Sequence, residues 1–238
     1  MQAVELDIIV ESVAKSYGNF QALQGVDLRV KRGEFLTVFG TNGAGKTTLI
    51  KLLSTLTKPT SGKITLANHD IKKEPDKVRS LIGVISHDPY LYENLSAIEN
   101  LKFFASLYGI PQAEEKAIEM IKQVGLESRM HDLVRTLSRG MKQRLAVARA
   151  IVHDPNILLL DEPYTGLDQH GSRIFGEILK LLKSQTRTIL MTTHKIEEGL
   201  GISDSVAILS GGRIVYECDP RGVEIERFKE IYFEKVRV

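Results

Sequence analysis

The sequence has few of the features that mark secreted, disulfide-bonded or membrane-embedded chains. Its 238 residues include one cysteine, Cys218, and no tryptophan, so no disulfide can form within the chain. No apolar run approaches the roughly 20 residues that a membrane-spanning helix needs. The segment from Met1 to Asp7 lacks the positive start and apolar stretch of a signal peptide. We therefore expect a cytosolic chain in a reducing compartment, in which Cys218 is structural.

An excess of charge of one sign is also missing. The formal net charge of +2 gives no electrostatic reason to expect nucleic acid as a partner, although a mildly basic surface suits an anionic membrane face. The chain has no internal repeat and no low-complexity linker. Its length is large for one compact domain and small for two. We therefore expect one α/β domain, residues 1–238, that carries an insertion.

A phosphate-binding motif is the most informative feature that is present. Residues 40–47 read G-T-N-G-A-G-K-T and fit G-x-x-x-x-G-K-[ST] between an apolar strand, 34–39, and a helix that begins at Lys46. Glycines let backbone N–H groups turn toward phosphate oxygens at a helix start, where the dipole favours anions. A plain glycine-rich turn is the alternative, but it does not require the strand and helix around it. The residues expected to bind the nucleotide here are Gly40, Thr41, Asn42, Gly43, Ala44, Gly45, Lys46, Thr47 and Thr48.

Two side chains of the motif have specific expected roles. Lys46 supplies a mobile positive charge for the β- and γ-phosphates, and the Thr47 hydroxyl is the expected ligand of Mg²⁺. The motif therefore predicts a nucleoside triphosphate and Mg²⁺ as cofactors.

Hydrophobic patterning predicts the order of the elements. Alternation up to about residue 39 predicts strands of a mostly antiparallel β layer, and further strands are predicted at 63–66 and 82–85, with a helix-like segment at 75–80 between them. Continuous apolar runs at 156–161 and 188–192 predict central parallel strands buried on both faces. Residues from about 90 to 153 read as wholly helical, with Pro111 in the first turn of a helix. Apolar spacing in residues 222–238 predicts a short amphipathic helix that packs on the core.

Acidic residues and a histidine follow the two central strands. Asp161 closes the first strand and is directly followed by Glu162, and His194 follows the second. Ligands of open parallel sheets bind outside the carboxyl ends of the strands, so these side chains should converge on the phosphate loop. Asp161 then suits Mg²⁺, and Glu162 suits a general base that polarises water. A solvated turn after a strand is the alternative interpretation of the Asp-Glu-Pro triplet.

A further motif identifies a family resemblance. Residues 137–144, L-S-R-G-M-K-Q-R, resemble the signature motif, usually L-S-G-G-Q, of ATP-binding cassette (ABC) ATPases, and the phosphate loop, signature, acidic strand and late histidine follow that family's order. The resemblance covers nearly the whole chain. It implies the ABC type of P-loop NTPase fold: a mostly parallel core sheet, an N-terminal antiparallel β layer and an inserted helical subdomain. We assign residues 1–89 and 154–221 to the nucleotide-binding core, 90–153 to the helical subdomain and 222–238 to a helical tail.

The resemblance also implies that the nucleotide is ATP and that its site is composite. Ser138 and Gly140 open a helix and would contact the γ-phosphate held by a second copy of the chain, in a head-to-tail homodimer. Asp168, in T-G-L-D, would be the D-loop residue that links the two sites, and His194 the switch histidine that contacts the γ-phosphate. Tyr17 matches the aromatic residue that stacks on adenine. Ser138 and Asp168 also fit simple helix caps, which is the alternative for both.

The chain departs from the usual family pattern at several positions. Arg139 replaces the first signature glycine, and Met141 replaces the glutamine. His87 stands where most members carry a glutamine that senses Mg²⁺ and water, which puts metal sensing at that position in doubt. The other histidines singled out are taken as surface or structural residues: His69, His131, His153 and His170.

Only a resemblance to one subgroup of the family indicates which compound is transported. His87, the segment 91–101, the signature variant and the D-loop segment 161–168 look like the haem-exporter ATPases of cytochrome c maturation. The chain would then power a separate integral-membrane subunit from the cytoplasmic face of the membrane without binding haem itself. One alternative is an ATPase of another multi-subunit exporter, for drugs, lipids or polysaccharide. The other is an ABC protein that acts on ribosomes or DNA rather than in transport.

Overall fold

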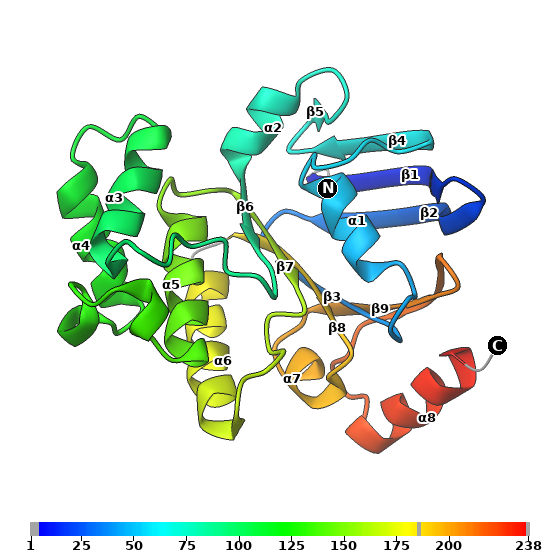
Figure 1. Ribbon diagram of the computed structural model, residues 1–238. Helices are drawn as coiled ribbons and strands as arrows, with labels where there is room; N and C mark the ends of the chain where they lie inside the picture. Colours follow the sequence, from blue (N-terminus) through cyan, green and yellow to red (C-terminus); the bar gives the residue numbers. More distant parts are fainter. Residues whose placement is uncertain (1–4, 185–186, 237–238) are drawn as a thin grey trace.

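The computed structural model describes residues 5–184 and 187–236 as one α/β structure built around two sheets (Figure 1). The larger sheet has the strand order β10-β9-β3-β8-β7-β6, and all its neighbouring pairs are parallel except β9 with β10. Its strands are β3 (Phe35–Phe39), β6 (Ile82–Ile85), β7 (Ile157–Asp161), β8 (Thr188–Thr193), β9 (Ser205–Ser210) and β10 (Arg213–Cys218).

The smaller sheet is antiparallel and has the order β2-β1-β4-β5. Its strands are β1 (Leu6–Tyr17), β2 (Phe20–Lys31), β4 (Ser61–Leu66) and β5 (His69–Asp70). The predicted β layer is thus confirmed, but its membership differs from the prediction. The strand before the phosphate loop, β3, is fully buried in the parallel sheet, whereas β4, from later in the chain, completes the antiparallel one. Alternation within one strand does not reveal its neighbour, which explains the difference.

Helices lie on both faces of the parallel sheet (Figure 1). They are α1 (Lys46–Leu53), α2 (Pro75–Leu81), α3 (Ala97–Leu107), α4 (Ala113–Gln123), α5 (Arg139–Ile151), α6 (Gln169–Ser184), α7 (Ile196–Leu200) and α8 (Ile225–Val236). Of these, α3 and α4 pack against α5 beside the sheet. Two short 3₁₀ turns, Glu127–Arg129 and Val134–Thr136, lie between α4 and α5, so the region from about 90 to 153 is mostly but not wholly helical. The described residues include no helix long and apolar enough to cross a membrane.

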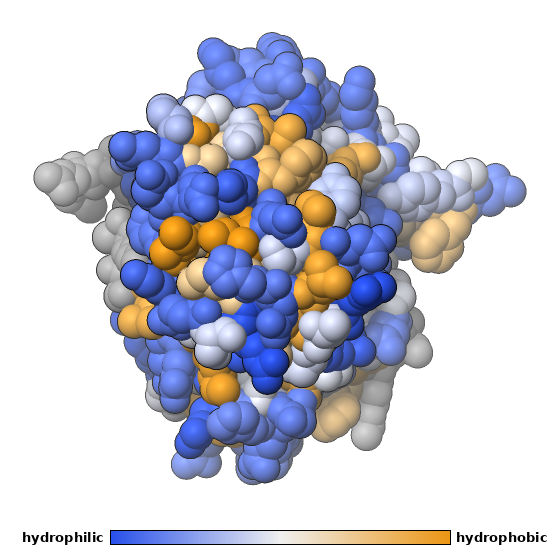
Figure 2. Space-filling model, turned by 60° about the vertical axis from the view of Figure 1, so that its left-hand side comes forward, coloured by the Kyte–Doolittle hydropathy of each residue, from blue (hydrophilic) through white to orange (hydrophobic). Residues whose placement is uncertain are grey.

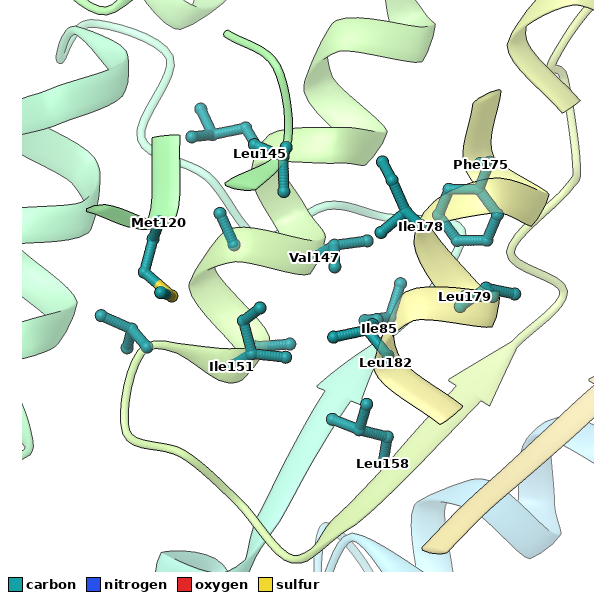
Figure 3. Close-up of a cluster of buried hydrophobic side chains, with 14 of the residues drawn as sticks. Ile85, Met120, Leu145, Val147, Ile151, Leu158, Phe175, Ile178, Leu179 and Leu182 are labelled. Carbon is teal, nitrogen blue, oxygen red and sulfur yellow. The ribbon is translucent and has the colours of Figure 1, made fainter. Parts of the chain in front are cut away.

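Two clusters of buried side chains hold these layers together. Successive residues of β7 belong to the two clusters in turn. Leu158 and Leu160 belong to the cluster under α3 to α6, and Ile157 and Leu159 belong to the cluster under α1 and the antiparallel sheet. Figure 3 shows the first cluster, where side chains of α4, α5 and α6 meet those of β6 and β7. A strand buried on both faces is expected to be apolar, and β7 is apolar up to its last residue, Asp161.

A local capping motif explains where α3 begins. Ser96 and Glu99 form a reciprocal capping box at the start of α3. α4 begins at Ala113, so Pro111 lies just before the helix rather than in its first turn. The predicted tail helix is present as α8; its buried residues are Phe228 and Tyr232, whereas Ile225 is exposed.

Candidate functional site

The phosphate loop connects β3 to α1 and has a conformation that requires glycine. Gly43 and Gly45 have φ of 82° and 109°, in the left-handed region that side chains disfavour. A Cβ on Gly40 would lie 2.5 Å from the carbonyl oxygen of Leu209, so the backbone passes too close to β9 for any side chain. α1 begins at Lys46 as predicted, which leaves the first N–H groups of that helix facing the loop.

Lys46 connects the loop to the predicted general base. Its side chain is 6% exposed, and its ammonium group donates to the carbonyl oxygens of Gly40 and Thr41, at 2.7 and 3.0 Å. The same Nζ lies 3.1 Å from Oε1 of Glu162. The buried ammonium group of Lys46 thus has a charged partner in Glu162. The γ-phosphate of a nucleotide would be an alternative partner for the same ammonium group.

Glu162 also contacts the predicted switch histidine. Its Oε2 lies 2.9 Å from Nδ1 of His194 and accepts the His194 backbone N–H at 3.3 Å. Glu162 has φ of 49°, a left-handed conformation that is unfavourable for a side chain of this size. Its backbone N–H donates to the Thr192 carbonyl oxygen at 2.9 Å, which fixes this bend. The bend turns Glu162 out of the strand direction, so Asp161 and Glu162 need not point to opposite faces.

Asp161 is held beside this group at the end of β7. It is 2% exposed, and its Oδ1 accepts the Thr192 hydroxyl at 2.7 Å. β7 and β8 are parallel neighbours paired at these two residues, so the sheet itself sets their separation. The structure thus brings together Lys46, Asp161, Glu162 and His194, which are far apart in the sequence.

A cavity of about 260 Å³ lies over the phosphate loop. Its lining residues are Phe20, Ala22, Asn42, Gly43, Gly45, Lys46, Thr47, Thr48 and Glu162. Tyr17 is not among them; it is 47% exposed and lies under the ammonium of Lys15 at 4.9 Å from the ring centre. Phe20 is the aromatic residue at the cavity, and sequence reasoning missed it. Its place follows from the pairing of Tyr17 with Phe20 across the β1–β2 turn, which no sequence motif marks.

The signature and D-loop residues line a second concavity of about 310 Å³. Ser138 caps α5 by accepting the Met141 N–H at 3.3 Å, and Asp168 accepts the Gly171 N–H at 2.6 Å. Both hydrogen bonds are those of simple helix caps. A capping role leaves the two side chains at the surface of this concavity. The concavity shares no lining residue with the phosphate cavity. One copy of the chain therefore brings Ser138, Gly140 and Asp168 together, but not with Lys46.

Arg139, the first departure from the usual signature, lies across this second concavity. A Cβ on Gly166 would be 2.1 Å from the Arg139 guanidinium carbon, so the side chain packs directly on the D-loop backbone. The glycine at 166 leaves the space that the arginine fills. His170 also lines this concavity and is exposed.

His87 does not line the phosphate cavity. It follows β6, its side chain is 53% exposed, and its Nε2 lies 3.6 Å from Oδ2 of Asp88. Of the other histidines, His69 contacts Glu74 at 3.1 Å, and His153 stacks on Tyr108 at a centroid distance of 3.7 Å. These two contacts are structural, as expected.

Comparison with known proteins identifies the family. The model of the family "ABC transporter" matches residues 23–165. The ABC transporter ATP-binding protein NatA of Bacillus subtilis is 40% identical over 199 residues, 82% of this chain and 81% of that protein. The Nod factor export ATP-binding protein I of Cupriavidus pinatubonensis is 38% identical and is covered over 66% of its length by 89% of this chain. The daunorubicin resistance ATP-binding protein DrrA3 of Streptomyces coeruleorubidus is 38% identical over 88% of this chain and 67% of that protein.

Solved structures agree with this assignment. CbiO1 of Clostridium perfringens, part of the ABC transporter complex CbiONQ, superposes with a TM-score of 0.84 and 30% identity over 96% of this chain and 93% of that one. The cassette MJ0796, a dimer in a post-hydrolysis state bound to ADP and Pi, gives a TM-score of 0.83 and 28% identity over 90% and 99%. This chain belongs to the ABC transporter ATP-binding family and is an ATPase with the ABC fold.

Proposed function

We propose that the protein is the ATP-hydrolysing subunit of a multi-subunit exporter and works as a head-to-tail dimer. The observation that carries the proposal is the group Lys46, Glu162 and His194 at the phosphate cavity, together with a separate concavity that holds the signature. Each copy thus offers half of two composite sites. A dimer that apposes the two surfaces completes both sites at once.

In this proposal each residue has a distinct task. Lys46 leaves Glu162 for the β- and γ-phosphates, and the freed Glu162 carboxylate accepts a proton from attacking water. His194, which contacts Glu162 through Nδ1, orients that water and the γ-phosphate. Ser138 and Gly140 of a second copy supply a hydroxyl and N–H groups to the same phosphate.

The residues present suit Mg²⁺. Asp161 places a carboxylate at the end of β7, and the Thr47 hydroxyl lines the phosphate cavity, so both offer the hard oxygen ligands that Mg²⁺ prefers. When bound, the ion would neutralise charge on the β- and γ-phosphates.

Two substitutions separate hydrolysis from binding. Glu162→Gln removes the base but keeps the shape, so turnover should fall by about 10²- to 10⁴-fold while ATP stays bound and the dimer stays closed. Lys46→Ala should instead weaken ATP binding by about 1.5–3 kcal/mol, because it removes a charge-assisted phosphate contact. Steady-state hydrolysis, nucleotide titration and light scattering measure these effects. Native turnover in Glu162→Gln would refute its role as base.

An exposed apolar surface offers a place for the membrane subunit. On the side of α3 and α4, hydrophobic residues lie exposed among hydrophilic ones (Figure 2). The exposed fractions are 57% for Tyr90, 51% for Tyr92, 39% for Phe103, 65% for Leu107 and 45% for Tyr108. Aromatic residues are enriched at protein interfaces. We propose that this surface, which begins just after His87, receives the membrane subunit and holds the protein at the cytoplasmic face of the membrane.

Leu107→Glu tests this surface. A charge there should reduce the membrane subunit recovered with the protein from detergent extracts by about tenfold or more, while ATP binding is unchanged. Leu56→Glu is the matched control, because Leu56 is 68% exposed but follows α1 instead. Equal recovery with both variants would place the docking surface elsewhere. Recovery of the native protein only with ribosomes or DNA would support the non-transport alternative.

The named relatives favour an exporter of a cargo other than haem. The two whose names state a cargo or drug concern Nod factors and daunorubicin, and neither name mentions haem. Haem export therefore stays a prediction of the sequence alone, and export of another compound is the reading we propose. Deletion of the gene followed by haem staining of c-type cytochromes separates the two. Normal cytochrome levels support the proposal, and their loss supports haem export.

A further inference from the structure

The C-terminal helix α8 packs against the residue that leads into the phosphate loop. Phe228 of α8 is fully buried, and its ring centre lies 5.2 Å from that of Phe39. Phe39 is itself fully buried, ends β3 and directly precedes Gly40. Close-packed interiors transmit displacements, so the position of Phe39 depends on a helix from the opposite end of the chain.

The same phenylalanine supports α7. A Cβ on Gly199 would lie 2.5 Å from Cζ of Phe39, so the α7 backbone rests directly on the ring. Lys229 of α8 lies 3.2 Å from Oε1 of Glu197 and joins the two helices at the surface, where Figure 1 shows them at the same end of the molecule. α7 begins at Ile196, immediately after the segment that holds His194.

A second side chain of α8 lies within the electrostatic reach of Glu162. Tyr232 is 6% exposed and belongs to the same buried cluster as Phe39 and Phe228. The pKa of its hydroxyl is raised by burial and by the negative charge of Glu162. α8 therefore contacts the residue before the loop and the helix after His194, and the charge of Glu162 reaches its Tyr232.

We infer that Phe228 is a positioning residue for ATP hydrolysis: by packing on Phe39, and through Phe39 on α7, it sets where His194 meets Glu162. The inference rests on the roles proposed above for Glu162 and His194. Phe228 touches neither the phosphate cavity nor the reacting groups, so its loss changes geometry without removing a nucleotide contact. A small misplacement of a catalytic group lowers turnover strongly while ground-state binding is kept.

The test compares three variants of the full chain. Phe228→Ala should lower kcat by about 5- to 50-fold with KM for ATP within about twofold of native, and Phe228→Leu should recover most of the loss. Phe233→Ala is the control, because Phe233 lies on the same helix but is 54% exposed; it should keep native kcat. Nitrogen-15 spectra of the nucleotide-free imidazoles add a direct readout. Phe228→Ala should shift the His194 signal and leave those of His69 and His153 in place.

Each outcome bears on the inference. Native kcat in Phe228→Ala overturns it, because the packing of Phe228 would then have no effect on turnover. A loss of activity in which every histidine signal moves and Phe228→Leu gives no recovery also overturns it, because that result indicates general destabilisation. His194→Ala separates the two proposals. If His194→Ala hydrolyses ATP at the native rate, the role of His194 itself is wrong; if it is inactive while Phe228→Ala is native, only the positioning role of Phe228 falls.

Discussion

At the scale of single residues, His153 shows how burial alone can make a side chain sensitive to pH. Its Nε2 lies 3.1 Å from the Ile82 carbonyl oxygen, which can only accept, so Nε2 carries the proton. The buried Nδ1 has no hydrogen-bond partner among the residues that the structure describes. Burial lowers the pKa of this imidazole below its usual value. Protonation would place an unpaired charge between Tyr108 and β6.

This gives a prediction with a definite sign. Because the folded-state pKa of His153 is depressed, its contribution to stability is fully present above the unfolded pKa of about 6.5 and is lost as pH falls below it. His153→Phe keeps a ring against Tyr108 but does not titrate. Urea unfolding should therefore show that the native protein is more stable than His153→Phe at about pH 7.5, by about 0.5–1.5 kcal/mol for the lost hydrogen bond. The difference in the free energy of unfolding should be smaller at about pH 5. A difference that grows on acidification would contradict this assignment.

The residues of the site differed in how far the sequence could predict them. Lys46 and Glu162 were predictable because a short local pattern fixes both their position and their chemistry. Phe20 was not, because its place at the cavity depends on the β1–β2 pairing rather than on a motif. The assignments of Tyr17 and His87 stay predictions, since neither lines the cavity of a single nucleotide-free chain.

At the scale of elements, the contact between α5 and β6 positions the signature. A Cβ on Gly83 would lie 2.3 Å from the Ala150 carbonyl oxygen and 2.8 Å from Cδ2 of Leu158, so the helix backbone lies directly on the strand. Ser138 is the N-cap residue of α5, and the helix reaches β6 near its last turn. The strand at 82–85 was predictable from its apolar run, but this close approach was not, because it depends on the tertiary packing of two distant segments.

Gly83→Ala should therefore destabilise the protein and displace α5. We expect a loss of about 1–3 kcal/mol in the free energy of unfolding, as for other overpacked cores. Gly176→Ala is the contrasting variant, because Gly176 lies within α6 and an added Cβ would lie 3.7 Å from its nearest neighbour, the Tyr164 hydroxyl oxygen. That change should be neutral or stabilising by up to about 1 kcal/mol. Urea titration of both variants measures this, and equal stabilities would mean that β6 and α5 separate without cost.

At the scale of the whole molecule, the proposed composite site rests on the separation of two cavities in one copy of the chain. The phosphate cavity holds Lys46 and Glu162, and the other concavity holds Ser138, Gly140 and Asp168. The fold class and order of motifs were predictable, because each motif lies at the end of a strongly patterned strand or helix. The pairing of one copy's phosphate loop with another copy's signature is a contact between two molecules. A single chain supports this pairing only in that its phosphate cavity and its signature concavity are separate.

Cross-linking between copies tests this composite site most directly. Asn42→Cys and Ser138→Cys are combined with Cys218→Ser and Glu162→Gln, since Asn42 and Ser138 line the two cavities and both are exposed. With ATP and a short bifunctional thiol reagent, we expect a covalent dimer on a denaturing gel, and each single-cysteine variant should stay monomeric. A double variant that stays monomeric with ATP, or that links equally without it, would contradict the composite site.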